Sequence, residues 1–287
     1  RDLMNWDQAL QLANTLAPQE IPLLSAETGQ QLEFKGEYQA ALDMYNQAVS
    51  AATQDSELYI RSLGGVARMT LRVGDISKGI SVATSSRSPL VMRDCASILE
   101  SLKQFSEAAQ LYVQAGMYDK AATIFIKLRQ SYQLKDIMSK VTSPTIHLQY
   151  AKAKEEEGDI AEAEKSYTMA KDLDSVIRLD LRYNKTPKKA FQLVRETGSQ
   201  DGARMVADFC QKVGDFRSAI EFLLMAKLPD DAFSLAQTHD AVDKFAEIIG
   251  DRGTPEQYAQ VATFYEGRGD FTEAGKVCYL FHSFVSI

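Results

Sequence analysis

The side chains that most often bind metals or act as nucleophiles are few in this sequence and spread singly along it. They are three histidines and three cysteines, namely His147, His239, His282, Cys95, Cys210 and Cys278. The sequence contains no CxxC pair, HExxH helix, phosphate-binding glycine loop or GxSxG nucleophile turn. We therefore expect buried thiols in a reducing compartment, a structural His147, and neither a metal nor a cofactor.

Paired carboxylates could serve general acid–base catalysis, but the pairs in this chain are close neighbours in sequence. Glu162 and Glu164, like Asp230 and Asp231, fall on expected surface helices or at helix starts, where acidic groups favour the helix dipole. Their spacing does not place two acids across a cleft, as acid–base work demands. An Arg-Gly-Asp string at 268–270 resembles an integrin ligand, yet its last two residues belong to a repeated turn. The sequence therefore predicts that the chain is not an enzyme.

Basic side chains on helix faces are the better candidates for a functional site, because they could hold acidic groups of a partner protein. Arg68 and Arg72 share one expected helix, and Arg204 and Lys212 share another. Some helical-repeat proteins clamp a peptide carboxylate with Lys and Asn at comparable positions, but no adjacent pair of repeats reproduces that set. The four residues are our candidates for protein binding.

The composition of the chain limits which classes of partner it can bind. The chain has 287 residues, 45% hydrophobic and 25% charged side chains, a net charge of −7 and a sequence pI near 5.2. Such an acidic chain is poorly suited to a nucleic-acid backbone, which a basic surface binds. No apolar run approaches the roughly 20 residues of a spanning helix. We expect neither nucleic-acid binding nor direct membrane insertion.

An internal repeat dominates the sequence. It is anchored on six turns, four of which read Gly-Asp, and an aromatic residue or Ile comes third in every one; a small residue stands seven positions before and five after each anchor. A bulky residue, often Tyr, follows nine positions after most anchors. The spacing puts these residues on the facing sides of paired helices, with glycine in the left-handed turn between them. The anchors are Gly36, Gly74, Lys103, Gly158, Gly214 and Gly269.

The last four anchors are 55, 56 and 55 residues apart, which is longer than a 34-residue tetratricopeptide (TPR) unit. Each interval has room for two further short helices, expected to start near Tyr118, Asp174 and Asp230. Helix starts are marked by a Ser or Thr before Pro, and we expect these hydroxyls to cap the helices, as at Ser88-Pro89, Thr186-Pro187 and Thr254-Pro255. We predict an all-α, right-handed α-solenoid of TPR-like helical hairpins with a 55–56-residue super-repeat.

We expect one solenoid segment over residues 1–287. Within it, residues 1–19 would end a truncated repeat and 20–87 would form two TPR-like repeats. Residues 88–280 would form three or more longer units of about 55 residues, and 281–287 an irregular tail. The start, which lacks Met and falls inside a repeat, suggests a cut through a longer polypeptide.

Particular strings are more specific than the repeat itself. They lie at residues 31–34, 93–95, 103–112, 146–154, 175–178, 194–197, 201–203, 232–237 and 248–250. In this order they resemble the TPR region of a large WD-repeat and TPR subunit family of intraflagellar transport complex A, over roughly residues 5 to 275.

That resemblance implies a non-enzymatic scaffold. Members of this family join other complex A subunits on trains in cilia and flagella, supporting retrograde transport and ciliary entry of membrane proteins. Its implied partners are those subunits and ciliary membrane-protein cargo adaptors. Its implied location is the cilium, flagellum and basal body, on the cytoplasmic side. Two alternatives stay open, a peptide-binding TPR adaptor and a vesicle-coat solenoid of the coatomer type.

Overall fold

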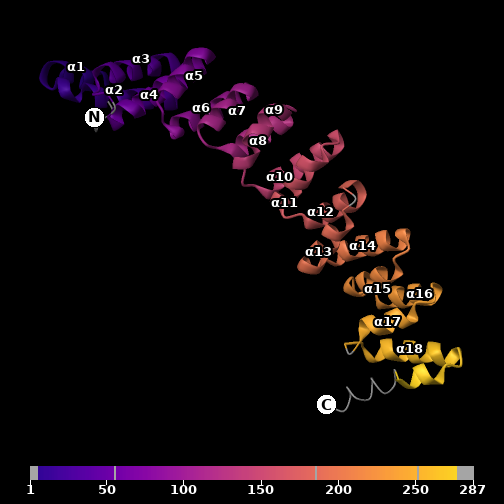
Figure 1. Cartoon of the computed structure of the whole chain (residues 1–287). Coiled ribbons are helices and arrows are strands. Elements are labelled where there is room, and N and C mark those ends of the chain that lie inside the picture. Colours follow the sequence, from indigo (N-terminus) through magenta and orange to yellow (C-terminus); the bar gives the residue numbers. More distant parts are fainter. Residues whose placement is uncertain (1–5, 55, 185, 251, 277–287) are drawn as a thin grey trace. The chain divides into compact units, whose positions relative to one another are not determined.

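A computed structural model of the chain describes residues 6–54, 56–184, 186–250 and 252–276. Every regular element in these ranges is a helix (Figure 1), which confirms the all-α prediction. None of the helices formed by these residues has both the length and the apolar character needed to cross a membrane.

The chain divides into two compact units, Arg1–Ile146 and His147–Ile287. In the first unit each helix packs against the next, and first helices of successive hairpins also touch, as α2 does with α4 and α4 with α6. Its helices are α1 (Trp6–Leu16), α2 (Ile21–Lys35), α3 (Tyr38–Ala51), α4 (Glu57–Val73), α5 (Ile76–Ser85), α6 (Pro89–Ser101), α7 (Phe105–Gln114), α8 (Tyr118–Lys127) and α9 (Ser131–Ile137), with 3-10 turns at Pro18–Glu20 and Met138–Lys140.

The second unit begins within α10 and continues the same pattern of hairpins. It contains a π-helical turn at Asp180–Asn184, directly after α12. Its helices are α10 (Pro144–Glu157), α11 (Ile160–Ala170), α12 (Leu173–Leu179), α13 (Pro187–Thr197), α14 (Gln200–Val213), α15 (Phe216–Met225), α16 (Pro229–Thr238), α17 (Val242–Ile249) and α18 (Pro255–Gly267).

The long super-repeat consists of four helices. Helices α6 to α9, α10 to α13 and α14 to α17 form successive sets, and the two extra helices of each set start near the predicted positions. This confirms the 55–56-residue period. The finer division at residues 19/20, 87/88 and 280/281 stays a prediction, and the expected tail at 281–287 lies outside the described residues.

The repeat anchors form the turns between paired helices. The anchor glycines have left-handed backbone, with φ from 77° to 106° at Gly36, Gly74, Gly158, Gly214 and Gly269. In the four Gly-Asp anchors the aspartate then accepts a hydrogen bond from the backbone N–H three residues on, and so caps the next helix. Each Gly-Asp pair thus ends one helix and starts the next.

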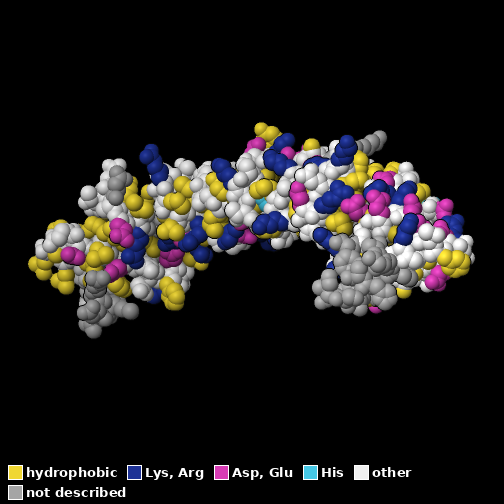
Figure 2. Space-filling view, turned by 60° about the horizontal axis from the view of Figure 1, so that its bottom comes forward, with side chains coloured by type: hydrophobic (Ala, Val, Ile, Leu, Met, Phe, Trp, Pro, Cys, Tyr) yellow, Lys and Arg dark blue, Asp and Glu magenta, His cyan; other side chains and the backbone are white. Residues whose placement is uncertain are grey.

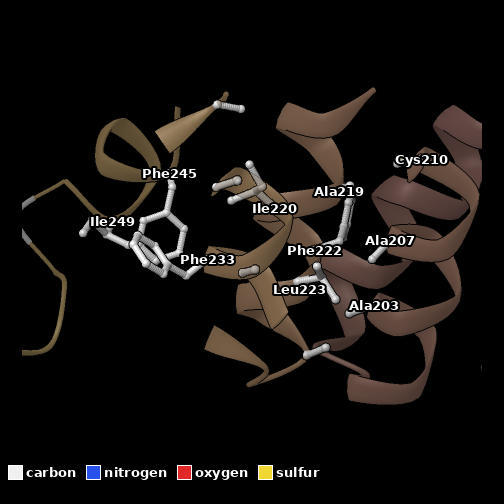
Figure 3. Close-up of a cluster of buried hydrophobic side chains, with 14 of the residues drawn as sticks. Ala203, Ala207, Cys210, Ala219, Ile220, Phe222, Leu223, Phe233, Phe245 and Ile249 are labelled. Atoms are coloured by element: carbon white, nitrogen blue, oxygen red, sulfur yellow. The ribbon is translucent and has the colours of Figure 1, made fainter. Parts of the chain in front are cut away.

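Small residues allow the paired helices to approach closely, and they are buried at both predicted offsets. In the second unit they meet aromatic and aliphatic side chains from the following helices (Figure 3), where Phe222 and Phe245 are fully buried. The small members of this cluster include Ala203, Ala207 and Ala219. Because each hairpin covers only its neighbours, the buried side chains of this unit form separate clusters along the stack instead of one central core.

Two predicted helix caps are wrong. Ser88 and Thr186 occupy N-cap positions, but neither side chain caps its helix. The Thr186 hydroxyl instead lies 3.2 Å from Oδ1 of Asp180, a fully buried carboxylate that needs a donor. Thr254, by contrast, forms a complete capping box with Gln257 at the start of α18.

Lys103 is the one repeat anchor that is not glycine, and its backbone also has positive φ, at 60°. Left-handed backbone costs an L-residue about 1–2 kcal/mol, and glycine avoids this cost. Glycine, however, has more conformational entropy in the unfolded chain, which takes back about 0.5–1 kcal/mol. We expect Lys103→Gly to raise the free energy of unfolding by about 0.5–1 kcal/mol. Urea unfolding followed by circular dichroism measures it. Gly214→Lys is the reciprocal control and should destabilise; a Lys103→Gly chain less stable than the wild type would contradict this account.

Candidate interaction surface

A polar contact recurs inside the hairpins. A glutamate three residues before the turn, on the first helix, accepts a hydrogen bond from a tyrosine nine residues after it, on the second. The tyrosine rings are almost fully buried, so each hydroxyl needs a partner at the edge of the core. The pairs are Tyr45 with Glu33 at 2.8 Å, Tyr112 with Glu100 at 3.2 Å, and Tyr167 with Glu155 at 2.9 Å.

An arginine from a later helix completes two of these pairs. Arg68 of α4 donates from Nε and Nη2 to the two carboxylate oxygens of Glu33, both at 2.9 Å. Arg178 of α12 does the same to Glu155 from its two terminal nitrogens, at 2.5 and 2.7 Å. Bidentate pairs of this kind are strong and directional. Each arginine therefore holds its own helix against the preceding hairpin.

We call each set of glutamate, tyrosine and arginine a triad. The glutamate and arginine of both triads stay charged near neutral pH. Burial opposes the ionised form of Glu33, but the hydrogen bond and charge of Arg68 outweigh it and leave the pKa of that carboxyl below its ordinary value. The hydrogen bond from Arg178 likewise lowers the pKa of Glu155. Burial and the bond to Glu155 raise the pKa of Tyr167 to about 12. No member of these two triads is thus poised to exchange a proton near pH 7, as acid–base catalysis requires.

Sequence reasoning treated the tyrosines as bulky fillers and missed their polar partners. The available signal was glutamate at the third position before the anchor in Glu33, Glu100 and Glu155, paired with tyrosine at the ninth position after it. Glycines also belong to this arrangement. A Cβ added at Gly65 would lie 2.5 Å from Cδ1 of Tyr45, so α4 approaches the ring only because Gly65 has no side chain.

The predicted protein-binding residues lie on one helix in each unit. Arg68 and Arg72 are on α4, where Arg68 is half-buried against Glu33 and Arg72 is exposed. Arg204 and Lys212 are both exposed on α14, and neither forms an ion pair with another described residue. The structure thus brings each pair onto one helix. Their role in protein binding stays a prediction.

A shallow hollow lies beside Arg68, between α2 and α4. It is lined by Gln30, Gln31, Glu33, Phe34 and Arg68. Phe34 is 91% exposed, more than any other large hydrophobic residue in the part of the chain that the structure describes. The hollow combines the paired polar groups of Glu33 and Arg68 with the apolar ring of Phe34. Such a surface is better suited to bind a side chain of another protein than to catalyse a reaction.

The remaining chemical candidates have structural surroundings. Cys95 and Cys210 are buried, which raises the pKa of each thiol to about 12, and Cys278 lies outside the described residues. Arg268 pairs with Asp240 at 2.5 Å, while Asp270 caps the helix that follows, so the Arg-Gly-Asp string is part of the turn. Among the described residues there is no cluster of three or more His, Cys, Asp or Glu that could hold a metal.

The stacked hairpins, their small-residue contacts and their glycine turns define a TPR-like α-solenoid segment. A family model that describes the TPR domain of intraflagellar transport proteins 140 and 172 matches residues 126–284, which is more than half of the chain. The chain belongs to this family.

Three relatives extend the match beyond the domain. The chain is 46% identical over 277 residues to the human WD repeat-containing protein 19, covering 96% of this chain and 20% of that protein. It is 40% identical over 257 residues to WD repeat-containing protein dyf-2 of Caenorhabditis elegans, covering 88% and 19%. With the intraflagellar transport protein osm-1 of the same organism it shares 24% identity over 271 residues, covering 85% and 15%. The chain spans about a fifth or less of each relative's length.

These matches confirm the resemblance inferred from the sequence strings. The part of WD repeat-containing protein 19, also called intraflagellar transport protein 144, that the chain resembles is its TPR region. The similarity covers nearly the whole chain, so it includes both compact units and their repeat turns.

The close approach at Gly65 gives one prediction. Ala in a helix interior normally gains about 0.5–1 kcal/mol over Gly, but overpacking costs about 1–3 kcal/mol. We expect Gly65→Ala to lower the free energy of unfolding by about 1–2 kcal/mol, because the new methyl group displaces the Tyr45 ring. Gly267→Ala is the matched control, since a Cβ there meets nothing within 4 Å. Chemical unfolding of both variants measures the difference; equal stabilities would show that the ring does not require Gly65.

The lowered pKa values of Glu33 and Glu155 give a second prediction. A carboxyl whose folded pKa is depressed contributes stability above its unfolded pKa, and this is lost as pH falls through the folded pKa. We expect the urea midpoint of the Glu33→Gln/Glu155→Gln variant to fall less than that of the wild type when pH is lowered below the ordinary glutamate pKa of 4.5. Glu37→Gln removes an exposed carboxylate and is the control. Parallel pH profiles for the wild type and the double variant would refute a role for the triads.

Proposed function

We propose that this chain is a non-enzymatic scaffold segment of an intraflagellar transport complex A subunit. The observation that supports the proposal most strongly is the match to WD repeat-containing protein 19 over 96% of the chain, on a fold that consists of stacked helical hairpins. Such arrays present long helical faces, and these faces are surfaces on which other proteins assemble.

The polar chemistry is consistent with this role. The bidentate ion pairs Arg68–Glu33 and Arg178–Glu155 join consecutive hairpins to each other, and so they maintain the stack. In the proposed role the segment joins other large WD-repeat and TPR subunits of complex A, with ciliary membrane-protein cargo adaptors as further partners. It would act in retrograde transport and in ciliary entry of membrane proteins, in the cilium or flagellum and at the basal body, on the cytoplasmic side.

A second candidate function is a peptide-binding adaptor. It is favoured by exposed cations, Arg72 on α4 and Arg204 and Lys212 on α14, which could contact acidic cargo tails. The third alternative, a vesicle-coat solenoid, has less support, because the family match is to transport-train proteins.

Co-purification tests the scaffold role. We expect a tagged protein containing this chain, expressed in ciliated cells, to enrich other complex A subunits in quantitative mass spectrometry. A matched version with Phe222→Asp, which places a carboxylate at a fully buried position, should lose the partners that depend on the segment. Failure of the unaltered protein to enrich any complex A subunit would reject the proposed function.

A further inference from the structure

Helix α4 carries three arginines on one face, but among the residues that the structure describes only Arg68 forms an ion pair with a carboxylate. Arg61, Arg68 and Arg72 are spaced seven and four residues apart, so they line one side of the helix. Arg68 is paired with Glu33. Arg61 donates instead to the side-chain oxygen of Gln30 at 2.6 Å, and its charge has no acidic partner among the described residues.

Arg72, at the other end of the row, likewise forms no ion pair with a described residue. Its Nη1 lies 3.3 Å from the hydroxyl of Tyr38, and its guanidinium stands 5.1 Å from the centre of that ring. Both contacts are with a neutral group, although the charge of Arg72 also helps to lower the pKa of Glu33, which Arg68 already pairs. The face therefore presents two exposed positive charges, one on each side of the Arg68–Glu33 pair.

The positive charge belongs to α4 itself, which has three arginines and one acidic residue, Glu57. Over residues 20–140 the charges balance, with 13 basic and 13 acidic residues. Residues 196–287, by contrast, contain 8 basic and 15 acidic residues. Figure 2 shows acidic side chains gathered over the C-terminal helices on the face in view. In contrast to Arg61 and Arg72, several arginines of the second unit have carboxylate partners, as in Arg195–Glu221 and Arg217–Glu247.

Phe34 adds an apolar contact to the same face. It projects from α2 at the rim of the hollow that Arg68 lines, and almost all of its surface is open to solvent. Covering an exposed aromatic ring removes apolar surface from water, which favours association. A bound segment that places an apolar side chain on Phe34 would have its neighbouring residues beside the arginine row.

We infer that the face formed by Gln30, Phe34, Arg61 and Arg72 binds an acidic segment of a partner protein that carries one bulky apolar side chain. The apolar side chain packs on Phe34, and carboxylates of the segment pair with Arg61 and Arg72. Arg68 is a positioning residue, because its charge is already matched by Glu33. The inference rests on the proposed function, since it names the partner chemistry of a scaffold surface.

Fluorescence anisotropy tests this inference on the full 287-residue chain. The probe is a fluorescein-labelled peptide of about ten residues, with alternating Asp and Glu around a central Phe. We expect saturable binding that weakens with added salt, because exposed charge pairs are screened. R61A/R72A and, separately, F34A should each weaken binding by about ten-fold or more, equivalent to about 1.4 kcal/mol. Circular dichroism melting confirms that the variants fold.

Matched controls separate this face from general charge attraction. Lys244→Ala removes an exposed cation of α17 and should leave the affinity unchanged. A peptide with Lys in place of the acids should not bind, and one with a central Ala should bind as weakly to the wild type as the Phe peptide binds to F34A. Absence of saturable binding, or binding that R61A/R72A and F34A do not weaken, would overturn the inference. Self-association of the unlabelled chain that these variants abolish would assign the face to a second copy, and would overturn it too.

The two proposals fail separately. If R61A/R72A and F34A leave peptide binding unchanged while the unaltered protein enriches complex A subunits, only the inference about this face is wrong. If the unaltered protein enriches no such subunit, the proposed function is wrong whatever the peptide does.

Discussion

The structure depends on how closely each helix can approach its neighbours. An α-helical hairpin has no interior of its own, so its apolar side chains are removed from water only where another hairpin covers them. Small residues at two fixed positions set that distance, and a large ring beside them fills the space that remains. Tyr45 shows the constraint most clearly, because glycines at positions 29 and 65 both face its ring. A ring placed so deeply must bring its hydroxyl to a polar partner, and Glu33 supplies one.

The polar triads follow from that packing and then reinforce it. A half-buried glutamate is unfavourable without a cation, and Arg68 reaches it from the next hairpin. Each bidentate pair thus links a carboxylate on one hairpin to a guanidinium on a later helix. Residues that resemble a reaction centre in type, a glutamate, a tyrosine and an arginine within hydrogen-bond distance, serve here to keep helices in register. The candidate interaction surface lies next to the first of them, where the arginine row of α4 continues on both sides of the Arg68–Glu33 pair.

Much of the fold could be predicted from the sequence because the repeat is local. Glycine at the turn and small residues seven before and five after it are determined by one hairpin, and they recur at each anchor. The triads were beyond this reasoning because they join different hairpins. Arg68 follows Glu33 by 35 residues, whereas Arg178 follows Glu155 by only 23, since the two lie in different kinds of repeat. Aligning the chain on its turns therefore does not superpose the two arginines. Exposure was equally hidden, because the apolar residues of α2 do not gather on one side of the helix, and only the packed neighbours show that Phe34 is uncovered.

The origin of Arg68 in the following hairpin has a consequence for how the stack comes apart. If the connection between α3 and α4 were cut by a protease and the later helices separated, Glu33 would keep its place beside Tyr45 but lose both donors from Arg68. The remaining hairpin would then hold a half-buried carboxylate without a counter-ion, an arrangement that favours protonation or unfolding. Cleavage of one connection thereby destabilises the hairpin that precedes it. Partial digestion should consequently release fragments that end after the helix supplying the arginine, and fragments that end just before it should be short-lived.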